Sequence, residues 1–265
     1  QKRRAGGTEQ DVGPEKTVLF KKRGTYTALR SMDEVKRWVD AAAERGRFAF
    51  DVETDNIDEM KAKPVGFSLS VESGEACYLP LVAESREVLP EEEVKEALRP
   101  LLEHEGLELI GHNFKYDYKV LSRWGIEPKT LAFDTMVAAW LIGTTASSYG
   151  MDALAEKWMG YTAISYKEVV PKGKPFSVVP LEQAAEYAAE DADVTFRFYE
   201  LFVPKLKEEG QEKLFYEMEM PLVPILARME MRGISIVPER LNEYSQELEE
   251  QLGEIERKIF SECGR

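Results

Sequence analysis

The stretch "FAFDVETD", residues 48–55, predicts a buried strand that runs into acidic side chains. Asp51 and Glu53 are two residues apart, so on a strand their side chains point to the same face. Two carboxylates on one face repel each other, and each raises the pKa of the other unless a cation lies between them. The pair indicates either a solvent-exposed strand end or a metal site, and the pair alone leaves both interpretations open.

The segments beside this strand alternate between helix and strand patterns. A capping box formed by Ser31 and Glu34 predicts a helix that ends before Gly46. The run "VGFSLSV", residues 65–71, alternates apolar and polar positions, which is typical of a half-buried strand. The run "EACYLPL", residues 75–81, is expected to pair with it in a hairpin through "ESG".

The rest of the chain adds more helices than strands. The expected elements are a helix at 90–106, a strand at 107–113, a helix at 116–125, a short strand and a helix at 131–143, a helix at 151–160, a Pro/Gly/Lys loop at 167–180, a long helix at 181–206 that Pro204 could interrupt, and further helix at 212–260. Strands come early and helices are interleaved later. This order predicts a mixed sheet flanked by helices, a three-layer α/β domain.

The composition restricts the function classes. The 265 residues carry a formal net charge of −14, so the chain should not coat nucleic acid by bulk electrostatics. Two cysteines, Cys77 and Cys263, suit a reducing compartment, and with only two histidines a His/Cys zinc cage is not expected. The sequence has neither an apolar run of membrane-spanning length nor a signal-peptide start. We expect a soluble intracellular protein with no membrane partner.

A second acidic stretch, "GHNFKYD", residues 111–117, follows a predicted strand and opens a helix. Ligands gather outside the carboxyl ends of strands in α/β sheets, which favours a binding role for Asp117. An acid in a first helical turn is also stabilised by the helix dipole, with no ligand required. Asn113 could equally be the N-cap of this helix.

A third acidic stretch, "YAAEDAD", residues 187–193, lies within the long predicted helix. Tyr187 and Asp191 are four residues apart and share one helix face. Glu190 and Asp193 point elsewhere, and we expect them to be solvated. The plain alternative is a tyrosine–aspartate contact on a surface helix.

Taken together, the three stretches favour a metal site over separate surface acids. Four carboxylates, of Asp51, Glu53, Asp117 and Asp191, come from three elements and can hold two Mg²⁺ or Mn²⁺ ions. Two such ions, roughly 3.5–4 Å apart, suit in-line displacement at a phosphodiester. Bound cations, rather than a basic surface, would then neutralise the scissile phosphate.

Two nearby features have simpler interpretations. Asp134 begins a predicted helix and is expected to be its cap. The loop "PKGKP", residues 171–175, could contact a phosphate backbone, but solvated lysines are the preferred interpretation.

The three stretches resemble the exonuclease motifs of the DEDD superfamily, tyrosine subclass, and more narrowly those of the 3′→5′ proofreading domain of bacterial DNA polymerase I, a family A polymerase. The segments "FDTM" at 133–136, "MDALAEKW" at 151–158 and "EMEMPLVPILARMEMRGISI" at 217–236 are similar to that protein too. The resemblance implies an RNase H-like fold at 25–208. It also implies the helical start of a polymerase domain at 209–265. The polar, Gly-containing first residues predict a flexible leader or linker at 1–24.

The resemblance also implies residue roles. Asp51, Glu53, Asp117 and Asp191 would bind the two divalent cations, Mg²⁺ or Mn²⁺, and Tyr187 with Glu53 would orient the attacking water. The implied substrate contacts are Thr54, Ile57, Asn113, Lys115 and Tyr116. Val52 replaces a more usual threonine and should point away from the site. His112 stands where glutamine is common and is not needed as a ligand.

The function expected from this resemblance is metal-dependent 3′→5′ exonuclease activity that releases nucleoside 5′-monophosphates from a DNA 3′ end, single-stranded or frayed. The polymerase domain would lie in cis, in a monomer of the bacterial cytoplasm associated with the nucleoid. One alternative is an RNA exonuclease of the same subclass, against which the polymerase-like C-terminal segment argues. The other is a catalytically silent scaffold, against which the intact carboxylates argue.

Overall fold

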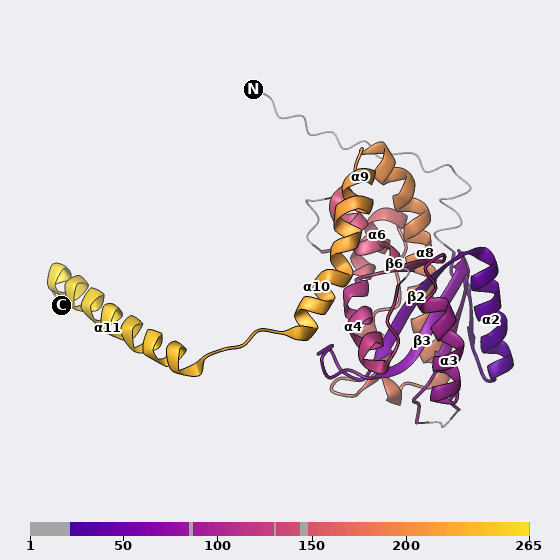
Figure 1. Cartoon of the computed structure of the whole chain (residues 1–265), viewed down its shortest axis with the longest axis horizontal. Coiled ribbons are helices and arrows are strands. Elements are labelled where there is room, and N and C mark those ends of the chain that lie inside the picture. Colours follow the sequence, from indigo (N-terminus) through magenta and orange to yellow (C-terminus); the bar gives the residue numbers. More distant parts are fainter. Residues whose placement is uncertain (1–21, 85–86, 130, 144–147, 265) are drawn as a thin grey trace. The chain divides into compact units, whose positions relative to one another are not determined.

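A mixed β-sheet forms the central layer of the computed structural model, which describes residues 22–84, 87–129, 131–143 and 148–264 (Figure 1). Within these residues the sheet has six strands in the order β1-β4-β3-β2-β5-β6. The strands are β1 (Thr25–Ala28), β2 (Arg47–Thr54), β3 (Pro64–Glu72), β4 (Glu75–Pro80), β5 (Glu108–Gly111) and β6 (Leu131–Asp134). β2 is antiparallel to β3 and parallel to β5, so the expected mixed sheet is confirmed.

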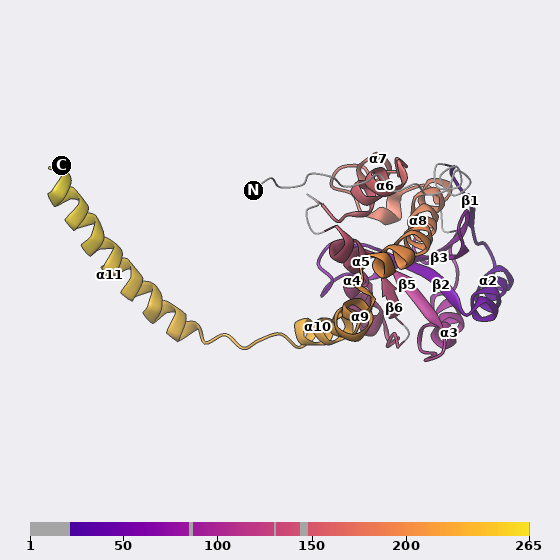
Figure 2. The ribbon, with the colours of Figure 1, turned by 90° about the horizontal axis from the view of Figure 1, so that it is seen from above.

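Helices cover both faces of this sheet. The helices are α2 (Met32–Arg45), α3 (Glu91–Leu102), α4 (Phe114–Trp124), α5 (Thr135–Ile142), α6 (Met151–Met159), α7 (Tyr166–Val169), α8 (Leu181–Glu208), α9 (Glu212–Leu214), α10 (Met220–Arg232) and α11 (Pro238–Cys263), with a 3-10 turn at Phe176–Val178 and a π-helical turn at Phe215–Glu219. Figure 2 shows the sheet between α8 on one side and α2 and α3 on the other. This is the predicted three-layer arrangement.

Alternation along β2 separates two cores. Phe48, Phe50 and Val52 point into the core shared with α2, α3 and α4. Ala49 belongs to the opposite core, which contains α5, α6 and α8. Because successive side chains on a strand alternate, Asp51 and Glu53 share the face of Ala49 and lie on the α8 side of the sheet.

The caps of α2 are those expected from the sequence. The Ser31 side chain accepts a hydrogen bond from the Glu34 backbone N–H, and the Glu34 carboxylate accepts one from the Ser31 backbone N–H at 3.0 Å. Gly46 ends the helix in the left-handed conformation with φ 73°, which glycine adopts without a Cβ penalty. The bounds of α2 could be predicted because the capping box and Gly46, both read from the local sequence, specify its two ends.

Some expectations need correction. β3 is buried on both faces rather than half-buried, because α8 packs on one face and the α2–α3 core covers the other. The expected loop at 167–180 contains most of the short helix α7 and the 3-10 turn. Pro204 lies inside α8 without ending it, at an exposed position close to the C-terminal end of the helix.

The chain divides into two compact units, the second of which begins at Arg232. Its helix α11 exposes apolar side chains at helical spacing, including Leu241, Tyr244 and Leu248. The predicted leader at 1–24 lies almost entirely outside the described residues. None of the helices in the described part of the chain has the length and apolarity needed to cross a membrane.

Candidate active site

Three carboxylates from two elements meet at one point beside the sheet. Asp51 and Glu53 come from β2, and Asp191 comes from α8, which packs across that face. One ligand oxygen from each of the three residues lies within 4.8 Å of the others. The i, i+2 spacing on the strand places the first pair, and the close approach of α8, whose buried face includes Ala188 and Ala192, brings the third.

The fourth predicted carboxylate lies in the same cavity. Asp117, in the first turn of α4, is buried and lines a cavity of about 300 Å³ together with the other three carboxylates and Tyr187. It is not a member of the group within 4.8 Å that the described residues form. The structure therefore gathers all four predicted carboxylates around one cavity, and those of Asp51, Glu53 and Asp191 lie closest to one another.

The site raises the pKa of each of these acids. Burial raises the pKa of Asp51 to about 6. Burial and then the charge of Asp51 raise the pKa of Glu53 well above its ordinary value. For Asp117 and Asp191 burial is again the largest cause, followed by the charge of Asp51. A divalent cation would offset this mutual repulsion, and hard cations prefer such oxygen ligands.

The hydrogen bonding of Glu53 fits a cation. Its Oε1 atom is buried, and no hydrogen-bond partner for it exists among the described residues. A buried carboxylate oxygen without a partner is costly unless it coordinates a metal. The donor set, four carboxylates without histidine or cysteine, suits Mg²⁺ or Mn²⁺ better than zinc.

Tyr187 lies one helical turn before Asp191 and lines the same cavity. Burial, and then the charges of Asp191, Glu53 and Asp51, raise the pKa of Tyr187 above its ordinary value. The phenol therefore stays protonated at neutral pH and can donate a hydrogen bond. Phe176 packs against its ring, with the ring centroids 5.7 Å apart.

Asp134 anchors the helix that carries Asp117. Its carboxylate accepts hydrogen bonds from the backbone N–H groups of Phe114 at 2.8 Å and Asn113 at 3.2 Å, at the start of α4. It also accepts from the N–H groups of Met136 and Val137 at the start of α5. The prediction of a helix cap is confirmed, and the carboxylate caps two helices rather than one.

This double cap explains the conformation of Asn113. The residue occupies the N-cap position of α4, with φ 56° and ψ 38°, but its side chain makes no capping hydrogen bond. Asparagine tolerates this left-handed conformation better than most residues. Because Asp134 supplies the cap, Asn113 is free to line the acidic cavity.

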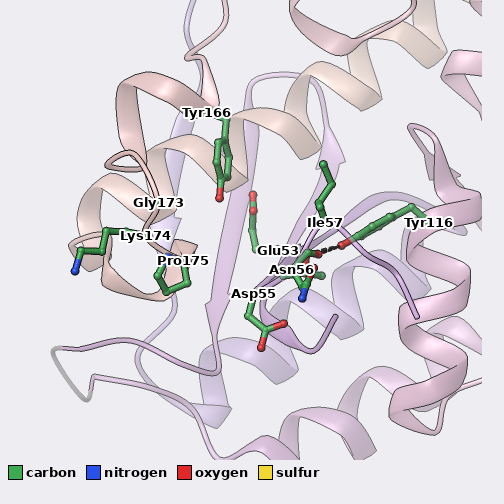
Figure 3. Close-up of a pocket in the computed structure, with 10 residues that line it drawn as sticks. Glu53, Asp55, Asn56, Ile57, Tyr116, Tyr166, Gly173, Lys174 and Pro175 are labelled. Atoms are coloured by element: carbon green, nitrogen blue, oxygen red, sulfur yellow. Dashed lines mark hydrogen bonds between the residues drawn. The ribbon is translucent and has the colours of Figure 1, made fainter. Parts of the chain in front are cut away.

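A second cavity, of about 570 Å³, adjoins the first and shares Glu53 and Tyr116 with it. Its lining residues are Glu53, Thr54, Asp55, Asn56, Ile57, Tyr116, Tyr166, Gly173, Lys174 and Pro175. Figure 3 shows Tyr166 and Pro175 to one side of Glu53, with Ile57 and Tyr116 to the other. The Tyr116 hydroxyl donates to the Asn56 carbonyl oxygen at 2.5 Å. The Thr54 hydroxyl lies 2.6 Å from the Tyr116 hydroxyl.

The predicted substrate contacts are placed unequally. Thr54, Ile57 and Tyr116 line the second cavity, and Asn113 and Tyr116 line the first. Lys115 lines neither of them. Its ammonium group is paired with the Glu230 carboxylate on α10 at 2.6 Å.

Sequence reasoning missed Tyr166, whose half-exposed ring faces the second cavity from α7. An isolated aromatic residue before a Pro/Gly loop carries no periodic signal that could have found it. The loop at 171–175 is exposed at its lysines, as expected, yet Lys174 also lines this cavity. One wall of the cavity is therefore built from a segment without regular patterning.

Glu190 and Asp193 were expected to be solvated, and this is wrong. Glu190 accepts hydrogen bonds from the Tyr161 hydroxyl at 2.5 Å and the Ile164 backbone N–H at 2.6 Å. Asp193 forms a buried ion pair with Arg197 and accepts from the Tyr26 hydroxyl at 2.8 Å. The parts of α8 that carry these two acids are covered by other elements, so buried partners rather than water hold the two carboxylates.

His112 also lines the acidic cavity. Its Nδ1 atom lies 2.8 Å from the Thr135 hydroxyl, and burial lowers its pKa to about 4. The side chain is therefore neutral at physiological pH and adds no positive charge to the carboxylates. Val52 packs into the core on the other face of β2, as its position in the motif predicts.

The fold and the acidic cavity define a nuclease-like α/β domain, and comparison with known proteins gives the family. Residues 26–207 match the family described as 3′-5′ exonuclease. The chain is 35% identical over 262 residues to DNA polymerase I of Rhizobium leguminosarum, covering 90% of this chain and 26% of that protein. It is 36% identical to DNA polymerase I of Treponema pallidum, covering 93% and 28% respectively. The chain belongs to the 3′-5′ exonuclease domain family of DNA polymerase I.

Solved structures share the fold. The POL domain of Pol1 from M. smegmatis aligns with a TM-score of 0.70 at 21% identity, covering 90% of this chain and 38% of that one. Escherichia coli RNase D aligns with a TM-score of 0.62 at 17% identity, covering 77% and 51%. The resemblance inferred from the motifs and the predicted fold class are confirmed. The chain spans about a quarter of the length of the polymerases it matches.

Proposed function

We propose that this domain hydrolyses the terminal phosphodiester of a DNA 3′ end with two divalent cations and releases nucleoside 5′-monophosphates. The observation that carries the proposal is the group of Asp51, Glu53 and Asp191, whose ligand atoms lie within 4.8 Å of one another. Together with Asp117, these carboxylates would hold Mg²⁺ or Mn²⁺. When bound, such ions lower the pKa of a water nucleophile and stabilise the departing oxygen.

The surrounding side chains have complementary roles. The protonated Tyr187 hydroxyl would donate to the attacking water, which Glu53 would orient from β2. The terminal nucleotide would occupy the second cavity, with Thr54 and Tyr116 beside its sugar end and Ile57 against its base. Apolar and aromatic contacts of this kind hold single strands without reading their sequence. Tyr166 supplies a further aromatic face on the same cavity.

Lys115 and Asn113 complete the proposed substrate contacts. Asn113 lines the acidic cavity and could reach the scissile phosphate region. Lys115 would have to exchange its partner Glu230 for a backbone phosphate. An ion pair near the surface can be exchanged in this way at modest cost.

In its parent protein the domain would edit errors of a polymerase domain in cis, to which residues 209–265 would lead. The support is that the curated relatives named here are bacterial DNA polymerase I proteins. The similarity to these polymerases also supports a location of the protein at the nucleoid in the bacterial cytoplasm. We expect the protein to be a monomer, with domain boundaries near residues 25 and 208.

Degradation of matched single-stranded DNA and RNA tests the substrate class. With Mg²⁺, the 5′-labelled DNA should shorten stepwise from its 3′ end and release deoxynucleoside 5′-monophosphates, while RNA of the same sequence is degraded more slowly. Faster degradation of RNA would favour the ribonuclease alternative.

Calorimetric titration with Mn²⁺ tests the scaffold alternative without reference to any substrate. The wild-type protein should bind Mn²⁺, and Asp191→Asn should weaken that binding. Equal, weak heats from both proteins would favour a silent scaffold.

A further inference from the structure

The loop between β2 and β3, residues 55–63, forms part of the second cavity. Its ends are joined by two hydrogen bonds between Asp55 and Lys63, from the Lys63 backbone N–H to the Asp55 carboxylate at 2.8 Å and from the Asp55 backbone N–H to the Lys63 carbonyl oxygen at 3.2 Å. Ile57, near its tip, is 92% exposed and lines the cavity without packing against the core. The position of this wall therefore depends on whatever holds the loop.

One face of α4 holds it. Tyr116, Lys119 and Arg123 follow one another at three- and four-residue spacing and so share a helix face. The Tyr116 hydroxyl donates to the Asn56 carbonyl oxygen, and Arg123 donates to the Glu59 carbonyl oxygen at 3.0 Å. Between them, the Lys119 ammonium group pairs with the Glu59 carboxylate at 2.5 Å.

Lys119 differs from an ordinary surface lysine. Its side chain is 2% exposed, and its second partner is the Glu230 carboxylate on α10, also at 2.5 Å. Burial by itself lowers the pKa of Lys119, but the hydrogen bonds that its ammonium group donates to Glu230 and Glu59 raise this pKa above its ordinary value, so the ammonium is charged. The Glu59 and Glu230 carboxylates are 33% and 41% exposed, so Lys119 is the buried member of the group that links the loop to α10.

We propose that Lys119 is a positioning residue that fixes the loop at 55–63, and with it the Ile57 wall of the substrate cavity, against α10. The expected effect on KM rests on the proposed exonuclease function, whereas the effect on the position of the loop does not. Lys119 acts through the loop and is not one of the residues that line the acidic cavity. Its loss should therefore weaken the hold on a DNA 3′ end and leave the chemical step intact.

The kinetic test compares Lys119→Met with Lys61→Met. Lys61 belongs to the same loop, but its pair with Asp58 is exposed, so its removal should change nothing measurable. For single-stranded DNA, Lys119→Met should raise KM about tenfold and leave kcat within about twofold, since a charge-assisted hydrogen bond is lost from the loop anchor. The kcat on thymidine 5′-(4-nitrophenyl phosphate), whose single nucleotide would occupy the same cavity, should also stay within about twofold while its KM rises. Lys119→Arg should recover most of the KM.

Amide hydrogen exchange tests the same role without any substrate. The backbone N–H groups of Lys61 and Ala62 both donate to the Asp58 carbonyl oxygen inside the loop, at 2.9 and 2.8 Å. Lys119→Met should speed their exchange about tenfold and leave the amides of β2 and β3 unchanged. Glu230→Gln, which leaves Lys119 its pair with Glu59, should act in the same direction by less.

These results separate the two proposals. Wild-type exchange in both Lys119→Met and Glu230→Gln, or an equal loss of kcat on both substrates by a folded Lys119→Met protein, would overturn the positioning role. If exchange accelerates only in the loop while the wild-type protein fails to degrade DNA, the positioning role stands and the proposed substrate is wrong.

Discussion

Replacing Asp134 by alanine should destabilise the domain more than the same replacement of any exposed acid. The buried carboxylate accepts four backbone hydrogen bonds at the starts of α4 and α5, and alanine leaves all four N–H groups without this acceptor. One helix cap is worth about 0.5–2 kcal/mol. Two caps with buried donors place the expected loss in the free energy of unfolding at about 2–4 kcal/mol.

The substitution should also affect the site. Asp117 lies three residues after Phe114, in the first turn that Asp134 anchors. Loosening that turn moves Asp117 relative to the other carboxylates, so kcat on single-stranded DNA should fall at temperatures where the variant is fully folded. Asp134→Asn retains one oxygen acceptor and should lie between wild type and Asp134→Ala in both measurements.

Urea unfolding followed by circular dichroism measures the stability change. The matched control is Asp33→Ala, which removes an exposed acid from the first turn of α2 and should change the free energy of unfolding by less than about 0.5 kcal/mol. A value for Asp134→Ala within about 0.5 kcal/mol of wild type would refute the double-cap argument.

Three further predictions concern the acidic cavity and its neighbour. Because folding raises the pKa of Asp51 to about 6 and those of its partner acids as well, the folded state binds more protons than the unfolded state at neutral pH. In EDTA the Tm should therefore rise as pH is lowered from about 8 to about 6, and Mg²⁺ should raise the Tm at pH 8 and flatten this dependence; a flat profile in EDTA would contradict it. Tyr187→Phe should lower kcat about 10²-fold with unchanged Mn²⁺ affinity by calorimetry, and an unchanged kcat would remove Tyr187 from the mechanism. Ile57→Ala should leave the free energy of unfolding within about 0.5 kcal/mol of wild type, because the side chain is exposed, yet raise KM for single-stranded DNA; an unchanged KM would exclude the proposed base contact.

The acidic cavity was largely predictable because its geometry follows from local periodicity. Alternation on β2 puts Asp51 and Glu53 on one face, and the helical repeat puts Tyr187 and Asp191 on one face of α8. What the sequence could not supply is the distance between elements. The closer grouping of Asp51, Glu53 and Asp191, with Asp117 outside it, depends on how α8 and α4 pack against the sheet.

The failures have a common physical cause, which is burial set by tertiary contacts. The strand pattern of β3 alternates, but its serines are buried because helices cover both faces. β1 has no apolar run of its own and becomes a strand by pairing in parallel with β4. Glu190 and Asp193 have the pattern of solvated helix acids, but each has a buried partner. The partner of Glu190 is Tyr161, from the segment that follows α6, and the partner of Asp193 is Arg197, one turn further along α8.

The measurement that tests the central claim most directly is degradation of a 5′-labelled single-stranded DNA by the wild-type protein and by Asp51→Ala/Glu53→Ala, with Mg²⁺, with Mn²⁺ and with EDTA. The account predicts a ladder that shortens from the 3′ end, that needs a divalent cation, and that is absent from the double variant even though its circular dichroism is native. A ladder that persists in EDTA or in the double variant, or no ladder from folded wild-type protein with either metal, would contradict the assignment of the acidic cavity as the catalytic centre.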